Sequence, residues 1–226
     1  MKKYISIIFI IIVLVGLIFL IFQFYKNKDT GSSIVLIPYS TEETETTTNE
    51  EVAPINNLEN KKSMQATLNT SLGTIKIEFY DKDAPKTVEN FKKLANDKFY
   101  DGVKFHRVIK GFMIQGGDPL SKDDSKINIW GSGGPGYKFA DEINAKSDLY
   151  AKVGYQKGIV AMANSGPNTN GSQFFIMHAN YPLPPLYTIF GKVISGQEVV
   201  DKIANVQTGA NDRPVEAVVI NSITVN

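Results

Sequence analysis

Cysteine is absent from the 226 residues, which excludes disulfide bonds, thiolate metal sites, a cysteine nucleophile and lipid anchoring on cysteine. Histidine is scarce, because His106 and His178 are the only two, and this argues against a histidine-rich metal site. The formal net charge is only +1, so nothing in the composition indicates a nucleic-acid-binding protein. We therefore expect no metal, no other cofactor and no nucleic-acid partner, and the chemistry must come from other side chains.

The small net charge conceals three segments of different charge. Residues 1–28 carry four lysines and no acid, and residues 29–62 carry two lysines and seven acids. Residues 63–226 carry eighteen basic and sixteen acidic side chains. Hydrophobic residues make up 42% of the chain, which is enough for one globular core. The changes in charge along the sequence predict a membrane anchor over 1–28, a disordered polar linker over 29–62 and one domain over 63–226.

The anchor prediction depends on residues 4–22, which are nineteen residues without a charge. As a helix they would reach about 28 Å, enough to span a hydrocarbon core. A cleaved signal peptide is the alternative, but its apolar region is usually shorter and small residues follow it, whereas residues 23–28 read QFYKNK. Lysines flank both ends, so charge favours an inside N terminus only weakly. We expect a single-pass protein of the cell membrane with an extracytoplasmic domain.

The linker has almost no apolar periodicity. Residues 40–51 read STEETETTTNEE, a composition that cannot form a core and is typical of a flexible spacer. An acidic docking segment is the alternative interpretation, but polar tracts beside membrane anchors usually serve as tethers.

The domain begins with a predicted hairpin and helix. Residues 64–70 and 74–80 alternate apolar and polar side chains around a turn at 71–73. Asp83 is the expected helix cap, and Pro85 suits the first helical turn. One buried stripe is expected from the helical spacing of Val88, Phe91, Leu94 and Ala95.

The remainder reads as a β-rich domain. Short apolar runs are separated by glycine, proline and asparagine clusters, which indicates a closed barrel, with a second short helix over residues 198–204. The runs cover residues 103–109, 112–115, 158–163, 173–177, 188–193 and 217–225.

Two long motifs resemble the signature segments of cyclophilins. Residues 105–118 read FHRVIKGFMIQGGD and residues 162–175 read MANSGPNTNGSQFF. Supporting runs are GYKFADE at 136–142 and YTIFGKV at 187–193. The chain is similar to cyclophilin-type peptidyl-prolyl cis/trans isomerases over residues 64–226, in a bacterial-like, membrane-anchored form. The resemblance implies a mainly β fold, a closed eight-stranded antiparallel barrel capped by two helices, with the groove on its outer face.

The same resemblance implies the site residues. It places the catalytic arginine at Arg107 and counts Phe112 and Gln115 with it as catalytic. It implies proline-containing polypeptides as partners, a monomer, and a role in protein folding as a rotamase or chaperone. The residues it assigns to substrate binding are Met113, Ala163, Asn164, Ser165, Gln173, Phe175, Leu183 and Tyr187.

The sequence departs from the family pattern in three places. Tyr187 stands where many members have a histidine. Pro182 falls near a tryptophan of cyclosporin-binding members, and the only tryptophan here is Trp130, so cyclosporin binding is doubtful. Residues 120–129 extend the usual loop and look like a solvated insertion.

These residue types suit the reaction. Rotation about an X-Pro bond breaks no bond but meets a barrier of about 18–20 kcal/mol. Arg107 could donate to the pyramidal nitrogen of the twisted amide, which a protein that only binds peptides would not need. A surface arginine is the alternative for Arg107. His106 is expected to be a structural, hydrogen-bonded histidine, because the reaction needs no proton transfer.

Overall fold

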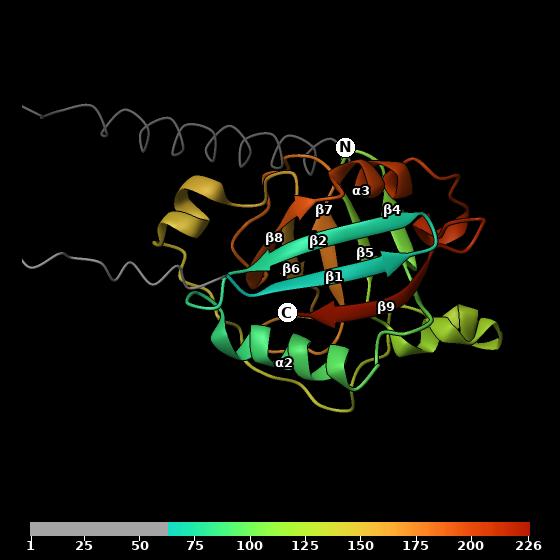
Figure 1. Cartoon of the computed structure of the whole chain (residues 1–226), viewed down its shortest axis with the longest axis horizontal. Helices are drawn as coiled ribbons and strands as arrows, with labels where there is room; N and C mark the ends of the chain where they lie inside the picture. The colour runs from blue at the N-terminus through green and yellow to red at the C-terminus, as the bar shows by residue number, and fades with distance from the viewer. Residues whose placement is uncertain (1–62) are drawn as a thin grey trace, which may run out of the picture. The chain divides into compact units, whose positions relative to one another are not determined.

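The computed structural model describes residues 63–226, coloured in Figure 1. The predicted anchor and linker lie outside the described residues. Within residues 63–226 no helix is both long enough and apolar enough to cross a membrane.

The first two strands form the predicted hairpin. β1 (Gln65–Thr70) pairs antiparallel with β2 (Gly73–Phe79), and the chain turns back at residues 71 and 72. In β1 every second side chain is buried, as expected for a sheet with one face on the core. The alternation in the sequence therefore predicted both strands and the turn between them.

One curled antiparallel sheet contains all nine strands of the described residues, in the order β3-β9-β1-β2-β8-β6-β7-β5-β4. Its edge strands, β3 (Val103–Lys104) and β4 (Arg107–Ile109), lie two residues apart in the chain but do not pair with each other. The sheet is therefore a curled half-barrel and not the closed barrel that was expected. The expected count of eight strands was wrong because the predicted run 103–109 is interrupted there. The remaining strands are β5 (Met113–Gly116), β6 (Ile159–Met162), β7 (Phe174–Met177), β8 (Ile189–Ser195) and β9 (Val219–Val225).

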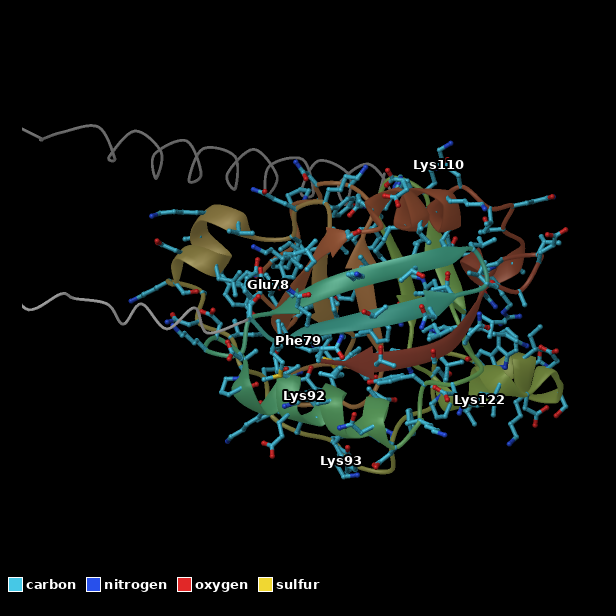
Figure 2. The ribbon with its side chains drawn as sticks, viewed as in Figure 1. Glu78, Phe79, Lys92, Lys93, Lys110 and Lys122 are labelled. Carbon is cyan, nitrogen blue, oxygen red and sulfur yellow. The ribbon has the colours of Figure 1, made fainter. Side chains whose placement is uncertain are left out.

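Within residues 63–226, two α-helices lie on opposite sides of the curled sheet (Figure 1). α2 (Pro85–Asn96) buries the predicted stripe, and α3 (Gln197–Ala204) is the expected second helix. Lys93 of α2 points away from the sheet (Figure 2), as the amphipathic pattern requires.

The prediction that Asp83 caps α2 was wrong. The N-cap residue is Ala84, which has no side-chain cap. The Glu142 carboxylate instead accepts hydrogen bonds from the backbone N–H groups of Lys86 (3.0 Å) and Thr87 (2.8 Å) and from the Thr87 hydroxyl (2.8 Å). A carboxylate distant in sequence thus satisfies the free N–H groups of the first helical turn.

Apolar side chains form two clusters, one on each face of the strands. The main cluster fills the inside of the curl and contains Ile114, Phe174 and Ile176. A second cluster lies on the other face and contains Met113, Phe175 and Met177. Because neighbours along a strand point to opposite faces, the β5 and β7 runs supply both clusters. The second cluster forms a firm base for side chains on the outer face.

The segment 120–129, which the sequence suggested as an insertion, is folded into two 3₁₀ helices, η1 (Pro119–Lys122) and η2 (Asp124–Ile129). Only Ser121 is buried within them, so the insertion is largely solvated, as predicted. Two further short helical segments are a single π turn, η3 (Leu149–Val153), and η4 (Ala210–Asp212).

Candidate active site

Three neighbouring strands place the central residues of the site side by side. Arg107 on β4 pairs with Gln115 on β5, and Gln115 pairs with Phe175 on β7. Directly opposite residues point to the same face of a sheet. The pairing therefore sets a cation, an amide and an aromatic ring in one row on the outer face.

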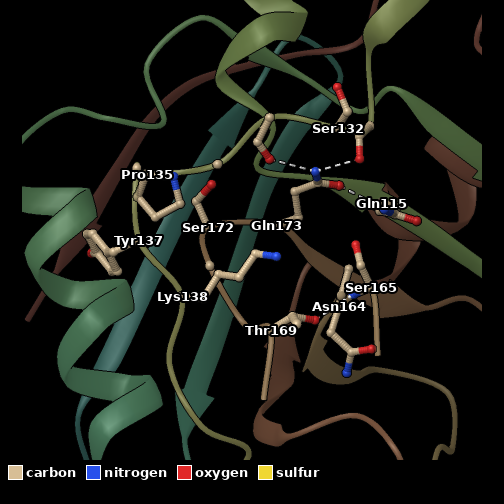
Figure 3. A pocket seen from close by; sticks show the side chains of 16 residues that line it. Gln115, Ser132, Pro135, Tyr137, Lys138, Asn164, Ser165, Thr169, Ser172 and Gln173 are labelled. Carbon is tan, nitrogen blue, oxygen red and sulfur yellow. Dashed lines mark hydrogen bonds between the residues drawn. The ribbon is translucent and has the colours of Figure 1, made fainter. Parts of the chain in front are cut away.

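These residues line a groove of about 710 Å³. Nine of the eleven predicted site residues lie in it, namely Arg107, Phe112, Met113, Gln115, Ala163, Asn164, Phe175, Leu183 and Tyr187. The other two, Ser165 and Gln173, line an adjoining hollow of about 570 Å³ that shares Gln115, Ala163 and Asn164 with the groove (Figure 3). The structure thus brings all eleven together.

Hydrogen bonds hold the Gln115 side chain in place between the two hollows. Its Nε2 donates to Gln173 Oε1 (3.0 Å), and Gln173 Nε2 in turn donates to the carbonyls of Gly131 and Gly133, both at 2.8 Å (Figure 3). The Gln115 oxygen makes no side-chain hydrogen bond within residues 63–226. It is free to accept from a peptide N–H in the groove.

Asn164 offers its backbone rather than its side chain. Its Nδ2 donates to Leu186 O (2.8 Å), and its Oδ1 accepts from Gly166 N (3.2 Å). In the described part of the chain its own backbone N–H and C=O have no backbone partner. A peptide lying in the groove could bond to both groups in the manner of an added strand.

The apolar end of the groove is built from aromatic rings and methionine. Met113 and Phe175 are only 2% and 5% exposed and belong to the second cluster. The Phe112 ring packs on Tyr181 with 4.5 Å between centroids, and Phe175 meets Tyr187 edge-on at 5.5 Å. A buried base with half-buried walls can hold a small apolar ring such as that of proline.

Two tyrosine hydroxyls, from the buried Tyr155 and the partly buried Tyr150, fix the backbone around Tyr187. The Tyr155 hydroxyl donates to Tyr187 O (2.8 Å) and accepts from Tyr187 N (3.1 Å), and the Tyr150 hydroxyl accepts from Ile189 N (2.9 Å). Burial raises the pKa of Tyr155 to about 12 and raises that of Tyr150 further, so both hydroxyls stay protonated at neutral pH. Tyr187 therefore stands on a rigid support at the rim.

Both arginines of the chain line the groove, although the sequence pattern singled out only one. Arg107 Nε lies 3.3 Å from Asp212 Oδ2, and the two side chains are 43% and 49% exposed. The Arg107 Nη groups make no hydrogen bond within residues 63–226 and remain available to a ligand. Groove residues that sequence reasoning missed are Tyr181, Asn128, Trp130, Gly131, Asn211, Asp212 and Arg213.

His106 differs from the expectation in one respect. It is buried, with 5% exposed, but neither ring nitrogen has a hydrogen-bond partner of good geometry among residues 63–226. Burial lowers the pKa of His106, opposed by the charge of Asp118 and a contact with the Lys104 backbone, and the charges of Arg107 and Arg213 lower it slightly further. The expected hydrogen-bonded histidine is instead a neutral, buried ring beside Arg107.

The groove contains no arrangement suited to a metal ion. Across residues 63–226, no group of three or more His, Asp or Glu side chains converges as ligands would. The groove instead presents a guanidinium, side-chain amides and unpaired backbone groups beside an apolar slot.

Comparisons with known proteins agree with this geometry. The sequence model of the family described as cyclophilin type peptidyl-prolyl cis-trans isomerase/CLD matches residues 65–225. Peptidyl-prolyl cis-trans isomerase CYP18-1 of Arabidopsis thaliana is 49% identical over 164 residues, covering 72% of this chain and 96% of that protein. Peptidyl-prolyl cis-trans isomerase A of Mycobacterium tuberculosis is 48% identical over 179 residues, covering 71% and 91%.

Solved structures show the same fold. A cyclophilin type peptidyl-prolyl cis-trans isomerase of Cryptosporidium parvum has a TM-score of 0.64 at 34% identity, covering 73% of this chain and 98% of that one. The same protein in the presence of the dipeptide Ala-Pro has a TM-score of 0.63, covering 72% and 98%. The chain therefore belongs to the family of cyclophilin-type peptidyl-prolyl cis-trans isomerases.

Proposed function

We propose that Arg107 is the catalytic donor of this isomerase and that the groove beside it holds the X-Pro bond of a polypeptide substrate. The observation that carries the proposal is the combination of free Arg107 Nη groups with an apolar slot two strands away. Gln115 lies between them, so a peptide held in the slot has its prolyl nitrogen near the guanidinium.

The reaction requires a donor of this kind. Amide resonance sets a barrier of about 18–20 kcal/mol, and the uncatalysed change takes tens to hundreds of seconds. In the twisted state the nitrogen becomes pyramidal and regains a lone pair. A donor aimed at that lone pair binds the twisted amide better than either planar form, which lowers the barrier. A guanidinium stays charged at every working pH and presents its N–H groups in a fixed plane.

One hydrogen bond is not enough. Turnover in milliseconds requires about five decades of acceleration, or about 7 kcal/mol. Positioning supplies part of this energy: Met113 and Phe175 hold the pyrrolidine ring, and Gln115 with the Asn164 backbone holds the flanking chain. The half-enclosed groove also strengthens the electrostatic interaction between Arg107 and the nitrogen.

A protein that only holds Pro-containing peptides is the rival interpretation. The test is exchange spectroscopy on an Ala-Pro peptide with the fragment 63–226, in buffer containing a metal chelator. We expect added cis/trans exchange at catalytic protein concentrations. Line broadening from binding without any added exchange would support the rival.

We also propose that residues 1–28 tether the enzyme to a membrane, with the domain on the extracytoplasmic side. Support comes from the nineteen uncharged residues at 4–22 and the polar spacer at 29–62, which together let the domain reach flexible X-Pro segments near the surface. The full chain should stay in the membrane pellet after a carbonate wash, and a chain lacking 1–28 should not. A mature N terminus after Phe24, found by mass spectrometry, would contradict the anchor, and protease accessibility of intact cells tests the side.

A further inference from the structure

We infer that Asp212 is a positioning residue that orients the Arg107 guanidinium, and that the 120–129 insertion supports it through Arg213. The inference rests on the proposed role of Arg107 and assigns a function to two segments, η4 and the insertion, that the family motifs do not include.

The contact between the two side chains leaves the working end of the arginine free. Asp212 Oδ2 lies 3.3 Å from Arg107 Nε, the atom at the base of the guanidinium plane. A bond at Nε limits rotation of that plane while both Nη groups remain unbonded within residues 63–226. The carboxylate can therefore orient the Arg107 guanidinium without occupying the Nη–H donors that the substrate uses.

The backbone at Asp212 is held in an unfavourable conformation. Asn211 and Asp212 have φ values of 59° and 57°, two successive non-glycine residues in the left-handed region. Such conformations persist where the surrounding structure holds them, and they concentrate at functional sites. Here the conformation brings the Asp212 side chain to a strand 105 residues earlier in the chain.

The surrounding contacts hold η4 firmly. Gly209 N donates to Arg213 O (2.8 Å), and Val215 N donates to Gln207 O (2.9 Å), which closes the loop at its base. Arg213 Nη2 donates to Ile127 O in the insertion (2.8 Å), and the Arg213 guanidinium stacks on Trp130 at 4.9 Å. The insertion and η4 lie at the same end of the sheet (Figure 1).

Stability alone does not account for the pair. Both partners are about half exposed, and exposed ion pairs contribute little to folding because water and salt screen them. Orientation of a catalytic group needs no large interaction energy, because it needs only one preferred rotamer of Arg107.

The experiment measures kcat/KM and peptide Kd for the fragment 63–226 with Asp212→Ala, Asp212→Asn and a control. We expect Asp212→Ala to lower kcat/KM about fivefold, the rate equivalent of one ordinary hydrogen bond, with Kd and Tm unchanged. Asp212→Asn keeps an oxygen acceptor and should stay within about twofold of the wild type. Asp97→Ala, which removes an exposed carboxylate paired with Lys93 at 2.7 Å, should have no effect.

A double-mutant cycle with Arg107→Ala separates this inference from the proposed function. In the Arg107→Ala background, Asp212→Ala should cause no further loss, because Asp212 acts only through Arg107. The inference would be overturned if Asp212→Ala lowered kcat/KM equally in both backgrounds or raised it. It would also be overturned if Asp212→Ala left kcat/KM unchanged while Arg107→Ala lowered it. If Arg107→Ala alone left turnover normal, the proposed catalytic donor would be wrong instead.

Side-chain NMR provides a second measurement that does not depend on activity. The chain has only two arginines, so an ¹H–¹⁵N spectrum shows two Nε–H signals that the Arg107→Ala variant assigns. We expect Asp212→Ala to shift and exchange-broaden the Arg107 signal and to leave the Arg213 signal in place. An unchanged Arg107 signal would overturn the orienting contact.

Discussion

Replacing Phe112 with alanine should weaken peptide binding and kcat/KM by the same factor. The pyrrolidine ring carries three methylene groups, and burial of each stabilises binding by about 0.8 kcal/mol, or about 2.4 kcal/mol for the ring. Met113 and Phe175 form the buried base of the slot, whereas Phe112 is a half-buried wall that packs on Tyr181. Loss of this wall should remove somewhat under half of the ring burial, about 1 kcal/mol, which is roughly a fivefold change.

The slot holds proline equally in its planar and twisted states, so kcat should not change. NMR titration with an Ala-Pro peptide gives Kd, and exchange spectroscopy gives kcat/KM. Phe99→Ala is the matched control, because it removes another half-buried ring, one that packs edge-on against Tyr100 at 5.5 Å outside the groove. A loss confined to kcat, or no loss in either quantity, would refute the reasoning.

Two further predictions concern stability. Burial lowers the pKa of His106 below its unfolded value of about 6.5. On acidification the unfolded state therefore binds more protons than the folded state. The contribution of His106 to stability is present above that unfolded value and is lost as the pH falls through the folded pKa. Urea denaturation at pH 7 and pH 5 should show this decline, and His106→Phe should reduce it; an equally steep decline in the variant would contradict the assignment. Glu142→Ala should cost about 2 kcal/mol and lower Tm by about 4–8 °C, because it removes the cap of α2. Calorimetry measures it against Glu89→Ala on the exposed face of α2, and equal Tm values for the two variants would show that the cap is unimportant.

Local patterns predicted the elements whose cause is local. The β1–β2 hairpin follows from alternating side chains around a short turn, and α2 follows from one apolar stripe at helical spacing. The groove itself followed from motif resemblance, which named eleven residues that the structure brings together. Spacing alone could not have done this, because β5 pairs with β7 and not with the next strand along the chain, β6.

The features that sequence reasoning missed depend on contacts between distant segments. The cap of α2 comes from Glu142, 55 residues beyond Thr87, so the nearer Asp83 was the natural but wrong choice. Asp212 meets Arg107 across 105 residues, and nothing in the residues around it marks it as part of the groove. Tyr181 carried a usable signal, because it is an aromatic residue two positions before Leu183, which the resemblance assigns to substrate binding.

The central claim is that Arg107 contacts the twisted amide better than the planar one. The most direct test measures kcat/KM by exchange spectroscopy and peptide Kd by titration for the wild-type fragment 63–226, Arg107→Ala and Arg107→Lys. We predict that Arg107→Ala lowers kcat/KM by at least about a hundredfold while Kd changes by less than about threefold, because the lost interaction belongs to the transition state. Arg107→Lys keeps the charge without the planar fork and should recover only part of the rate. Near-normal turnover in Arg107→Ala, or a loss of kcat/KM matched by an equal loss of binding, would contradict the account.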